Sequence, residues 1–491
     1  TINHLFSTRI MRFQKNFFQK QRISKSLSSN LKNQIMIKRI LFCASFTITS
    51  FVMSQGPAIT SWLQNTTETG TYYTEGNSTA IGNGTLVNCQ QVAYTNTNVF
   101  VTTEGVPSYT TGPFLDFNPS NAEAQGAVYK FPLNPSPNTG SATPTTPGSI
   151  GVFINGVSLY DYRDGVAWNP NTGALCGGPG NQPCPGGMGA IMDWNRDAIP
   201  AEMGGFDCSK GHPAMGNYHH HQNPSAFNLD LNVVSTICNL YDAEGLYAID
   251  ANTHSPLLGY AYDGYPIYGA YGYKNADGSG GITRIKSSYQ LQNITTRPNG
   301  PDVGLVVTTT GPNGGQEELS LGYFREDYEY VAQPTEEESL DEHNGRICVT
   351  PEYPNGTYAY FCTVDENHNS AYPYAVGPTF YGVYSNASVN AVPGGATIYT
   401  PNTTGINNRF NNMSFDVFPN PSMELIAIQA NGLVIKPITV KLISSKGNVV
   451  KETKILAGQT IAYFDVQTLH QGAYWVRIST GKDVKQFKVI R

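Results

Sequence analysis

The chain has 491 residues, which is more than one compact domain usually contains, and a formal net charge of −6. The charge is uneven, because residues 55–413 hold 31 acidic and only 11 basic residues. Such a surface repels nucleic acid and anionic lipid, so we exclude nucleic-acid binding; a solvated acidic surface is the common explanation, and attraction of cations the functional one. The 50 Gly, 31 Pro and 30 Tyr residues favour a turn-rich, mainly β protein.

The N-terminal region contains two different segments. Because residue 1 is Thr, we interpret residues 1–35 as translated upstream sequence, with a genuine extended leader as the alternative. Residues 36–54 have the pattern of a secretory signal peptide, with a short basic start, an apolar run and small residues before Gln55. The apolar run is too short and too rich in Ser and Thr for a stable span, so we expect no integral membrane segment in the mature chain.

Seven cysteines follow the signal peptide, and export permits disulfide bonds. Spacing alone does not determine their connectivity. No CxxC pair is present, which argues against a zinc ribbon or a thioredoxin-like site. Proximity in the sequence suggests three pairs and leaves Cys89 as a thiol; the pairs are Cys176–Cys184, Cys208–Cys238 and Cys348–Cys362.

Histidine is rare in this chain, yet six of the nine histidines lie between residues 212 and 343. If residues 218–221 form a strand, His219 and His221 lie on one face with Cα atoms about 6.5 Å apart. A tight loop between Gly-flanked segments could bring His212 back as a third ligand. Three imidazoles with an open position suit Zn²⁺ or Cu²⁺ and could activate a bound water. Two further histidines are weaker candidate ligands, His254 and His343.

Two structural explanations compete with metal binding at these histidines. The run of three could be a solvated loop, or the imidazoles could be hydrogen-bonded members of a tyrosine-rich core. The positions of the side chains separate these alternatives. Convergence of His212, His219 and His221 to within about 4 Å in one pocket would favour a metal site. Side chains that diverge on a surface loop would favour a structural module.

Two carboxylates are candidate catalytic or supporting residues. Asp263 precedes Gly264 at a turn signal after alternating tyrosines, so its default role is in the turn, and the alternative is to orient a histidine. Glu342 is most simply a surface charge, and the alternatives are a metal ligand or a general base. Farther on, Asn355-Gly356 predicts a hairpin.

At these residues the body resembles the YHYH-domain family, which is named for a Tyr-His-Tyr-His motif. The resemblance covers roughly residues 150–384 within a β-rich body of 55–384. His220 stands where the motif has its second Tyr, and this departure puts in doubt any role that needs that phenol. The family implies no particular reaction. The matching segments are Cys208, Gly211-His212, Gly216, Tyr218-His219, His221, Pro224, Gly259–Gly269, Asn344-Gly345-Arg346 and Thr350–Tyr358.

The C-terminal part has a different composition. Residues 385–413 are rich in Asn, Thr, Gly and Ser, which predicts a linker, and residues 414–491 alternate in the manner of a small Ig-like β-sandwich. This last segment resembles the C-terminal sorting domain of type IX secretion substrates of the Bacteroidetes. The resemblance implies recognition by the outer-membrane translocon through residues 414–491, and a secreted or cell-surface protein. It rests on Val417–Pro421, Ser445-Lys446-Gly447, Leu469, Gly472–Arg477 and Lys485–Arg491.

We therefore hypothesise a secreted or cell-surface protein, exported through the periplasm, that binds a metal ion through His212, His219 and His221. The metal would be Zn or Cu. An enzymatic version would be a metal-dependent hydrolase or a copper oxidase assisted by Glu342 or Asp263. The competing hypothesis is an extracellular structural or adhesive β module without a metal.

Overall fold

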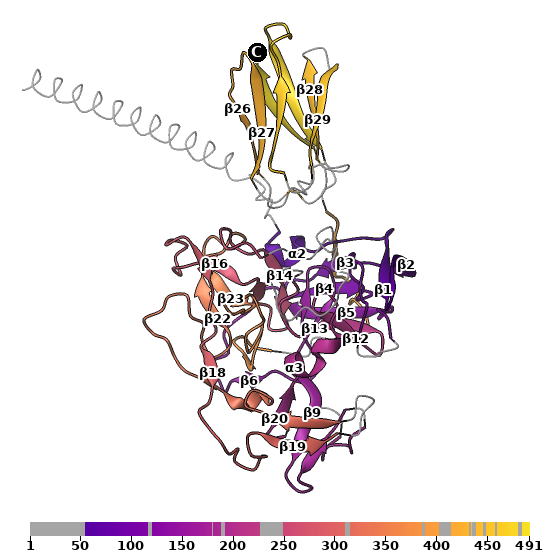
Figure 1. Ribbon diagram of the computed structural model, residues 1–491, viewed down its shortest axis with the longest axis vertical. Coiled ribbons are helices and arrows are strands. Elements are labelled where there is room, and N and C mark those ends of the chain that lie inside the picture. Colours follow the sequence, from indigo (N-terminus) through magenta and orange to yellow (C-terminus); the bar gives the residue numbers. More distant parts are fainter. Residues whose placement is uncertain are drawn as a thin grey trace, which may run out of the picture. The chain divides into compact units, whose positions relative to one another are not determined.

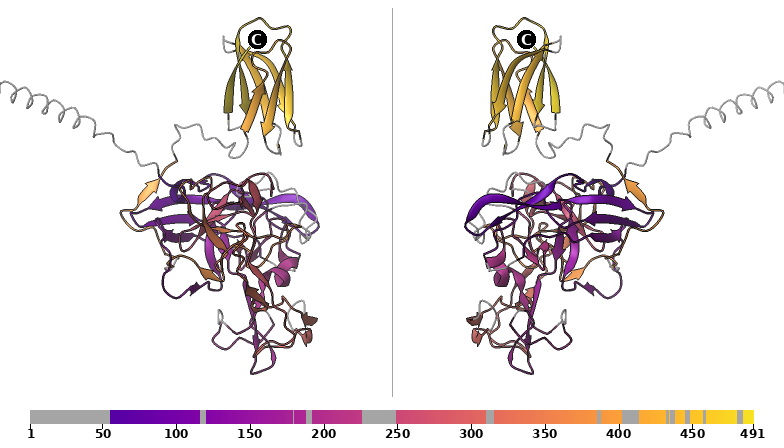
Figure 2. Two further views of the ribbon diagram at one scale, coloured as in Figure 1. Left: turned by 90° about the vertical axis from the view of Figure 1, so that its left-hand side faces the viewer. Right: turned by 90° about the vertical axis from the view of Figure 1, so that its right-hand side faces the viewer.

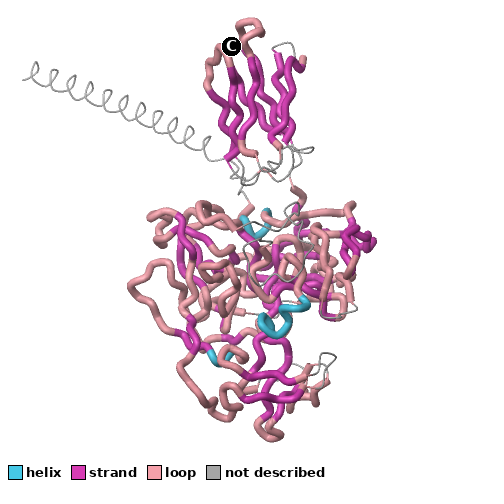
Figure 3. Tube along the Cα trace, viewed as in Figure 1, coloured by secondary structure: helices cyan, strands magenta, loops and turns pink. Residues whose placement is uncertain are grey.

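The computed structural model describes residues 55–491 except 116–119, 179, 188–191, 226–248, 310–314, 385–387, 402–413, 432–433, 435–437, 445–447, 457–458 and 480–483. The predicted signal peptide and the segment before it lie outside these residues. The described part is mainly β, as predicted, and its short helices are few among strands and loops (Figure 3). None of these helices has the length and apolar character needed to cross a membrane. The helices are α2 (Pro57–Thr60), α3 (Ala198–Glu202), and the 3-10 turns η1 (Met203–Gly205) and η2 (Arg325–Asp327).

The body is built on an eight-stranded sheet, which runs in the order β12-β13-β8-β7-β14-β15-β23-β22. Figure 1 labels β12, β13, β14, β22 and β23 of this sheet. Four antiparallel hairpins supply the eight strands, and two parallel contacts, β13 with β8 and β15 with β23, join hairpins. Every residue of β14 is buried, which indicates a strand covered on both faces. The strands are β7 (Ser149–Phe153), β8 (Ser158–Tyr160), β12 (Gly211–Ala214), β13 (Asn217–His220), β14 (Leu257–Ala261), β15 (Pro266–Tyr268), β22 (Gly345–Cys348) and β23 (Thr357–Phe361).

A second sheet of the body, in the order β25-β3-β4-β5, shares a hydrophobic core with the first. Phe131 of β5 stacks on Tyr260 of β14 with ring centroids 5.3 Å apart, so aromatic side chains join the two sheets. One strand comes from the segment that composition predicted as linker, because Ile398 lies opposite Ala93 in the ladder. The strands are β3 (Cys89–Tyr94), β4 (Asn98–Thr103), β5 (Ala127–Pro132) and β25 (Thr397–Tyr399).

Small sheets extend the body around these two. Of these, β9, β10 and β11 form a three-stranded sheet, and the others are two-stranded. In the chain, β9 follows β8 and β11 leads into α3, which precedes the predicted histidine ligands. The strands are β1 (Thr69–Thr74), β2 (Asn77–Leu86), β6 (Thr143–Pro144), β9 (Arg163–Asn169), β10 (Ala174–Cys176), β11 (Asn195–Asp197), β16 (Tyr271–Tyr273), β17 (Ile282–Arg284), β18 (Tyr289–Leu291), β19 (Leu305–Thr308), β20 (Gln316–Leu319), β21 (Tyr328–Tyr330) and β24 (Thr379–Phe380).

The last part of the chain forms a β-sandwich of its own, in agreement with the sequence prediction (Figure 2). A three-stranded sheet, β26-β27-β30, and a four-stranded sheet, β29-β28-β31-β32, enclose one core. Alternation along β28 explains the packing, because Ile438, Val440 and Leu442 are buried while Thr439 and Lys441 are only partly so. The strands are β26 (Ser414–Phe418), β27 (Leu425–Asn431), β28 (Ile438–Ser444), β29 (Val449–Ile455), β30 (Ile461–Asp465), β31 (Ala473–Ser479) and β32 (Val484–Ile490).

The predicted disulfides have three different outcomes. Cys176 and Cys184 are bonded, as predicted. Cys208 is also in a disulfide, and its suggested partner Cys238 lies outside the described residues.

The third suggested pair is wrong, because Cys348 and Cys362 are buried thiols, as is the predicted thiol Cys89. The hairpin register explains the error. Cys348 lies opposite Thr357, five residues before Cys362, and five strand residues span about 16 Å. Proximity in sequence therefore misled, because the two residues lie toward opposite ends of the hairpin.

Candidate metal centre

The β12–β13 hairpin places three histidines on one of its faces. His212 and His219 are directly opposite in the antiparallel ladder, so their side chains leave the same face. His221 follows the strand two residues after His219 and joins them. The turn between the strands has left-handed backbone at Met215 (φ 50°) and Gly216 (φ 82°), the geometry of the tightest hairpin turns.

The three imidazoles converge inside the protein. All three residues are buried, and one potential ligand atom from each lies within 4.8 Å of the others. This separation is slightly wider than the 4 Å that we expected for a converged site. The solvated-loop alternative is therefore wrong, and the cluster could hold a metal ion.

Hydrogen bonds fix the orientation of two of the rings. The Nδ1 atom of His219 lies 2.8 Å from the carbonyl oxygen of Asn217, and that of His221 lies 2.5 Å from the carbonyl oxygen of Asp161. A carbonyl only accepts hydrogen bonds, so each Nδ1 carries the hydrogen and donates. In the neutral rings the Nε2 atoms then carry lone pairs, and these two atoms are 3.1 Å apart.

His212 completes the cluster with an unsatisfied nitrogen. Its Nε2 atom is buried and has no hydrogen-bond partner among the described residues. The ring packs edge-on against Phe206, with centroids 4.9 Å apart, and lies 4.6 Å from the ring of His219. An apolar wall thus covers one side of a group that still needs a polar partner.

A carboxylate that sequence reasoning missed lies beside the cluster. The Oε2 atom of Glu202 is 3.2 Å from Nε2 of His212 and 3.3 Å from Nε2 of His221. Glu202 is the last residue of α3, ten residues before the first cluster histidine in the sequence. The available signal was its isolation, because it is the only charged residue between positions 198 and 206.

The pKa values of His219 and His221 shift in opposite directions. Burial and the neighbouring imidazoles lower the pKa of His219 well below its usual range, so this ring is neutral at ordinary pH. Burial also opposes the charge of His221, but the Glu202 carboxylate outweighs it and raises the pKa of His221. In turn burial opposes ionisation of Glu202, yet His212 and His221 hold the pKa of this carboxyl well below its usual range.

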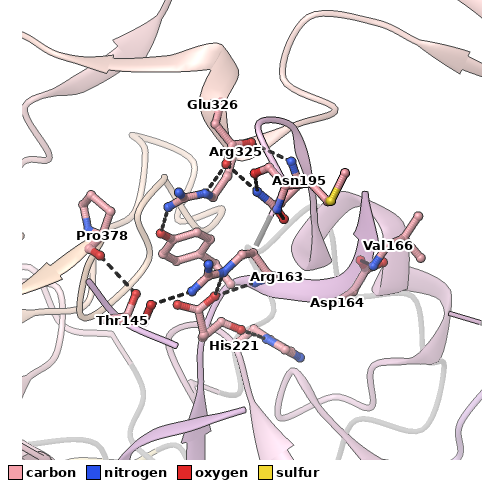
Figure 4. Close-up of polar contacts among 12 residues, drawn as sticks. Thr145, Arg163, Asp164, Val166, Asn195, His221, Arg325, Glu326 and Pro378 are labelled. Carbon is pink, nitrogen blue, oxygen red and sulfur yellow. Dashed lines mark hydrogen bonds and ion pairs between the residues drawn. The ribbon is translucent and has the colours of Figure 1, made fainter. Parts of the chain in front are cut away.

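Surrounding side chains position Asn217 and Asp161, whose carbonyl oxygens accept hydrogen bonds from the cluster histidines. The Tyr160 ring stacks on His219 with centroids 3.8 Å apart, and its hydroxyl accepts a hydrogen bond from the Asn217 amide. The Asp161 carboxylate accepts a 2.5 Å hydrogen bond from Arg163, which also donates to the Thr145 carbonyl in the network of Figure 4. The peptide that receives His221 is thereby tied into a buried ion pair.

His220, at the departure from the family motif, lies on the opposite face of β13. Its Nε2 is 2.9 Å from the Tyr109 hydroxyl and its Nδ1 is 3.1 Å from the Lys210 carbonyl oxygen. Burial lowers the pKa of His220 to about 3. The neighbouring Tyr218 donates to the carboxylate of Asp207. His220 is therefore a satisfied core imidazole in the position of the motif's second phenol.

The other sequence candidates have different partners. His254 donates from Nδ1 to the Ser255 carbonyl, and His343 has Nδ1 2.6 Å from the Thr379 hydroxyl. The Glu342 side chain is 58% exposed and lies 3.9 Å from its neighbour His343.

Asp263 is buried within the core of the body, on the β14–β15 hairpin. Its Oδ2 atom accepts hydrogen bonds from the Tyr360 hydroxyl at 2.6 Å and from the Gly382 amide at 2.8 Å. Burial raises the pKa of this carboxyl to about 6. The carboxylate thus connects the turn to β23 and to the segment after β24.

Fold and site together define a mainly β protein with a buried cluster of three histidines that could hold a metal ion. Residues 128–372 match the family model described as YHYH protein, so the chain is a YHYH-domain protein. Residues 416–491 match the secretion system C-terminal sorting domain, so the protein is secreted or attached to the cell surface. A search of curated proteins found no match to the chain.

Proposed function

We propose that this YHYH-domain protein binds one transition-metal ion through His212, His219 and His221 after export. The observation that carries the proposal is the convergence of three buried imidazoles. In two of them, His219 and His221, the Nδ1 atom already donates a hydrogen bond to a carbonyl oxygen. Such outer hydrogen bonds fix the tautomer and ring orientation of metal-binding histidines. The arrangement therefore has both the ligands and their supports.

The energetics of the cluster also support a bound cation. Two neutral imidazoles that present lone pairs to each other at 3.1 Å repel, and burial prevents water from relieving that repulsion. Either a proton on one ring or a metal ion between the rings removes the cost. Because a third nitrogen, Nε2 of His212, also lacks a hydrogen bond from the described residues, one proton leaves the cluster incompletely satisfied.

The donor set indicates the class of metal. Imidazole suits Zn²⁺ and Cu²⁺ among the first-row ions, as the sequence suggested. Zn–N bonds are about 2.0–2.1 Å long, so two nitrogens of a tetrahedral site lie about 3.3–3.4 Å apart. The 3.1 Å separation between the His219 and His221 nitrogens is close to this value. We therefore propose Zn²⁺ or Cu²⁺ as the ion.

The sorting domain supplies the export route of the proposed function. We propose that the outer-membrane translocon of the type IX system recognises residues 414–491 and exports the body, which then meets metal outside the cell. The β-sandwich in this segment and its match to a sorting-domain model support the proposal.

The deciding experiment is the metal content of the full chain, purified without a histidine tag and measured by inductively coupled plasma mass spectrometry. We expect about one Zn or Cu per chain. A His219→Asn/His221→Asn variant, in which each amide can still donate to its carbonyl, should lose this metal. His254→Asn is the matched control, because it removes a partly buried histidine outside the cluster, and it should keep the metal.

Two results would count against the proposal. Absence of metal from the wild-type chain, even after incubation with Zn²⁺ or Cu²⁺ and dialysis, would leave the structural or adhesive module as the function. Equal metal content in the wild-type chain and the double variant would place the ion elsewhere.

A further inference from the structure

We infer that Glu202 is a fourth protein ligand, which closes the metal site with a carboxylate. The inference rests on the proposed binding of a metal by the three histidines. It changes what that site can do, because a three-histidine site keeps an open position for water, whereas four protein ligands fill a tetrahedral ion.

Two contacts of Glu202 have the length expected between neighbouring ligand atoms, while the histidine ligand atoms lie within 4.8 Å of one another and would draw closer around an ion. Its Oε2 atom is 3.2 Å from Nε2 of His212 and 3.3 Å from Nε2 of His221. Two ligand atoms on a tetrahedral zinc ion are separated by about 3.3 Å, given bonds of about 2.0–2.1 Å. Three ligand-atom pairs therefore have separations close to this value: His212 with Glu202, Glu202 with His221, and His221 with His219.

The contacts of Glu202 do not have the geometry of ordinary hydrogen bonds. The Oε2 atom is buried, and it receives no hydrogen bond from the described residues although two imidazole nitrogens lie beside it. The Nε2 atom of His212 is in the same condition. Two adjacent buried polar atoms, each without a hydrogen-bond partner among the described residues, are a pattern that a shared cation would satisfy.

The fold holds Glu202 and His221 through neighbouring peptides. The carbonyl of Asp161 accepts the hydrogen bond from His221, and the carbonyl of Tyr162 accepts one from Ala198 at the start of α3. Asp197 caps the same helix by accepting from the Ile199 amide, and Tyr374 in turn donates to Asp197. The consecutive residues Asp161 and Tyr162 thus position His221 and the helix α3, which carries Glu202.

Charge supports the same assignment. Three neutral imidazoles would leave a divalent ion with its full charge in a buried site, which is costly. One carboxylate halves that charge. A site of three nitrogens and one oxygen also favours divalent ions such as Zn²⁺ and Co²⁺ over Cu⁺, which prefers sulfur ligands. The structure therefore favours a closed, metal-holding site over a hydrolytic one.

The test uses Co²⁺ as a spectroscopic substitute for Zn²⁺ in the full, untagged chain. We expect Co²⁺ to give the strong visible bands of a four-coordinate ion, and addition of azide to leave them unchanged because no position is open. Glu202→Gln should weaken Co²⁺ binding at least tenfold, and azide should then shift the bands. Glu342→Gln is the matched control, since it removes a carboxylate beside a histidine outside the cluster, and it should behave like the wild type.

Each alternative outcome has a separate meaning. If Glu202→Gln binds Co²⁺ as tightly as the wild type and both respond equally to azide, the carboxylate is not a ligand and the inference is overturned. If His219→Asn then still loses the metal, the three-histidine proposal survives. If the wild-type chain binds no Co²⁺ or Zn²⁺, both proposals fail. Circular dichroism verifies folding, and Glu202→Ala provides a second variant should the first not fold.

Discussion

The two faces of strand β13 carry the same residue type in opposite circumstances. On one face, His220 has both ring nitrogens engaged, one by the Tyr109 hydroxyl and the other by the Lys210 carbonyl. On the other face, His219 and His221 donate from Nδ1 but direct their Nε2 atoms at each other. All three residues are buried. Burial therefore does not distinguish a structural histidine from a candidate ligand, whereas the state of the second nitrogen does.

The largest difference between the faces should appear in metal affinity. Replacing His219 with Asn removes a ligand, and we expect affinity for Zn²⁺ to fall more than about a hundredfold, since loss of a mere outer-shell partner costs 10–100-fold. His220→Phe should leave affinity within about threefold, because its ring lies on the other face. Isothermal titration calorimetry of the apoprotein measures both. Equal losses in the two variants would mean that the fold, not ligation, controls binding.

The pH dependence of stability should depend on Asp207, which accepts hydrogen bonds from Tyr218 on the His220 face of β13. Burial raises the pKa of Asp207 to about 6, although hydrogen bonds from the Gly112 amide and the Tyr218 hydroxyl oppose the shift. Between pH 3.8 and 6 the folded state keeps a proton that the unfolded chain has released, so stability should decrease as pH rises through this window. Asp207 contributes about 3 kcal/mol at most to this decrease, at 1.36 kcal/mol per pKa unit.

Urea unfolding of the full chain between pH 4 and 6.5 measures this slope. Asp207→Asn should make the slope shallower by the contribution of Asp207, because the amide does not titrate, while the buried Asp164, Asp197 and Asp263 keep the rest. The exposed Asp277 supplies the control, and Asp277→Asn should retain the slope. An unchanged slope in Asp207→Asn would assign the titration to another buried carboxyl, of which Asp263 is one.

The sequence predicted the architecture of this site better than its chemistry. Alternation placed His219 and His221 on one face, and the glycines around His212 predicted the return of the chain, because strand period and turn geometry are local properties. The sorting domain was predicted for the same reason, from period-2 strands separated by turns.

What the sequence did not reveal depends on contacts between distant segments. Glu202 reaches the cluster because α3 is anchored at Tyr162, a contact across 36 positions of the chain. Likewise, Ile398 joins the body sheet through a partner about 300 residues earlier, so its composition suggested only a linker. The error over Cys348 and Cys362 has the converse cause, since hairpin register separates residues that are near in sequence.

A moderate loss of stability should follow when the satisfied face loses its hydrogen bonds. His220→Phe preserves the ring volume but leaves the buried Tyr109 hydroxyl and Lys210 carbonyl each without one partner. We expect the free energy of unfolding of the apoprotein to fall by about 1–3 kcal/mol. Denaturant titration checks this, and His219→Asn should cost less, because Asn can still donate to the nearby carbonyl. A larger cost for His219→Asn would show that the cluster stabilises the fold without metal.

The smallest effect concerns the turn that supports both faces. Met215 has a left-handed backbone (φ 50°) and is 87% exposed, so its side chain contributes little packing to offset the strain. Asn is better tolerated in this conformation and is preferred before Gly in such turns. Met215→Asn should therefore raise stability by about 0.5–1 kcal/mol, part of the cost of left-handed backbone for an ordinary side chain, and leave zinc affinity unchanged. Thermal unfolding of the apoprotein is the measurement. A loss of stability would mean that the Met215 side chain packs in solution, and a change in affinity would mean that hairpin geometry, in addition to ligand identity, limits the site.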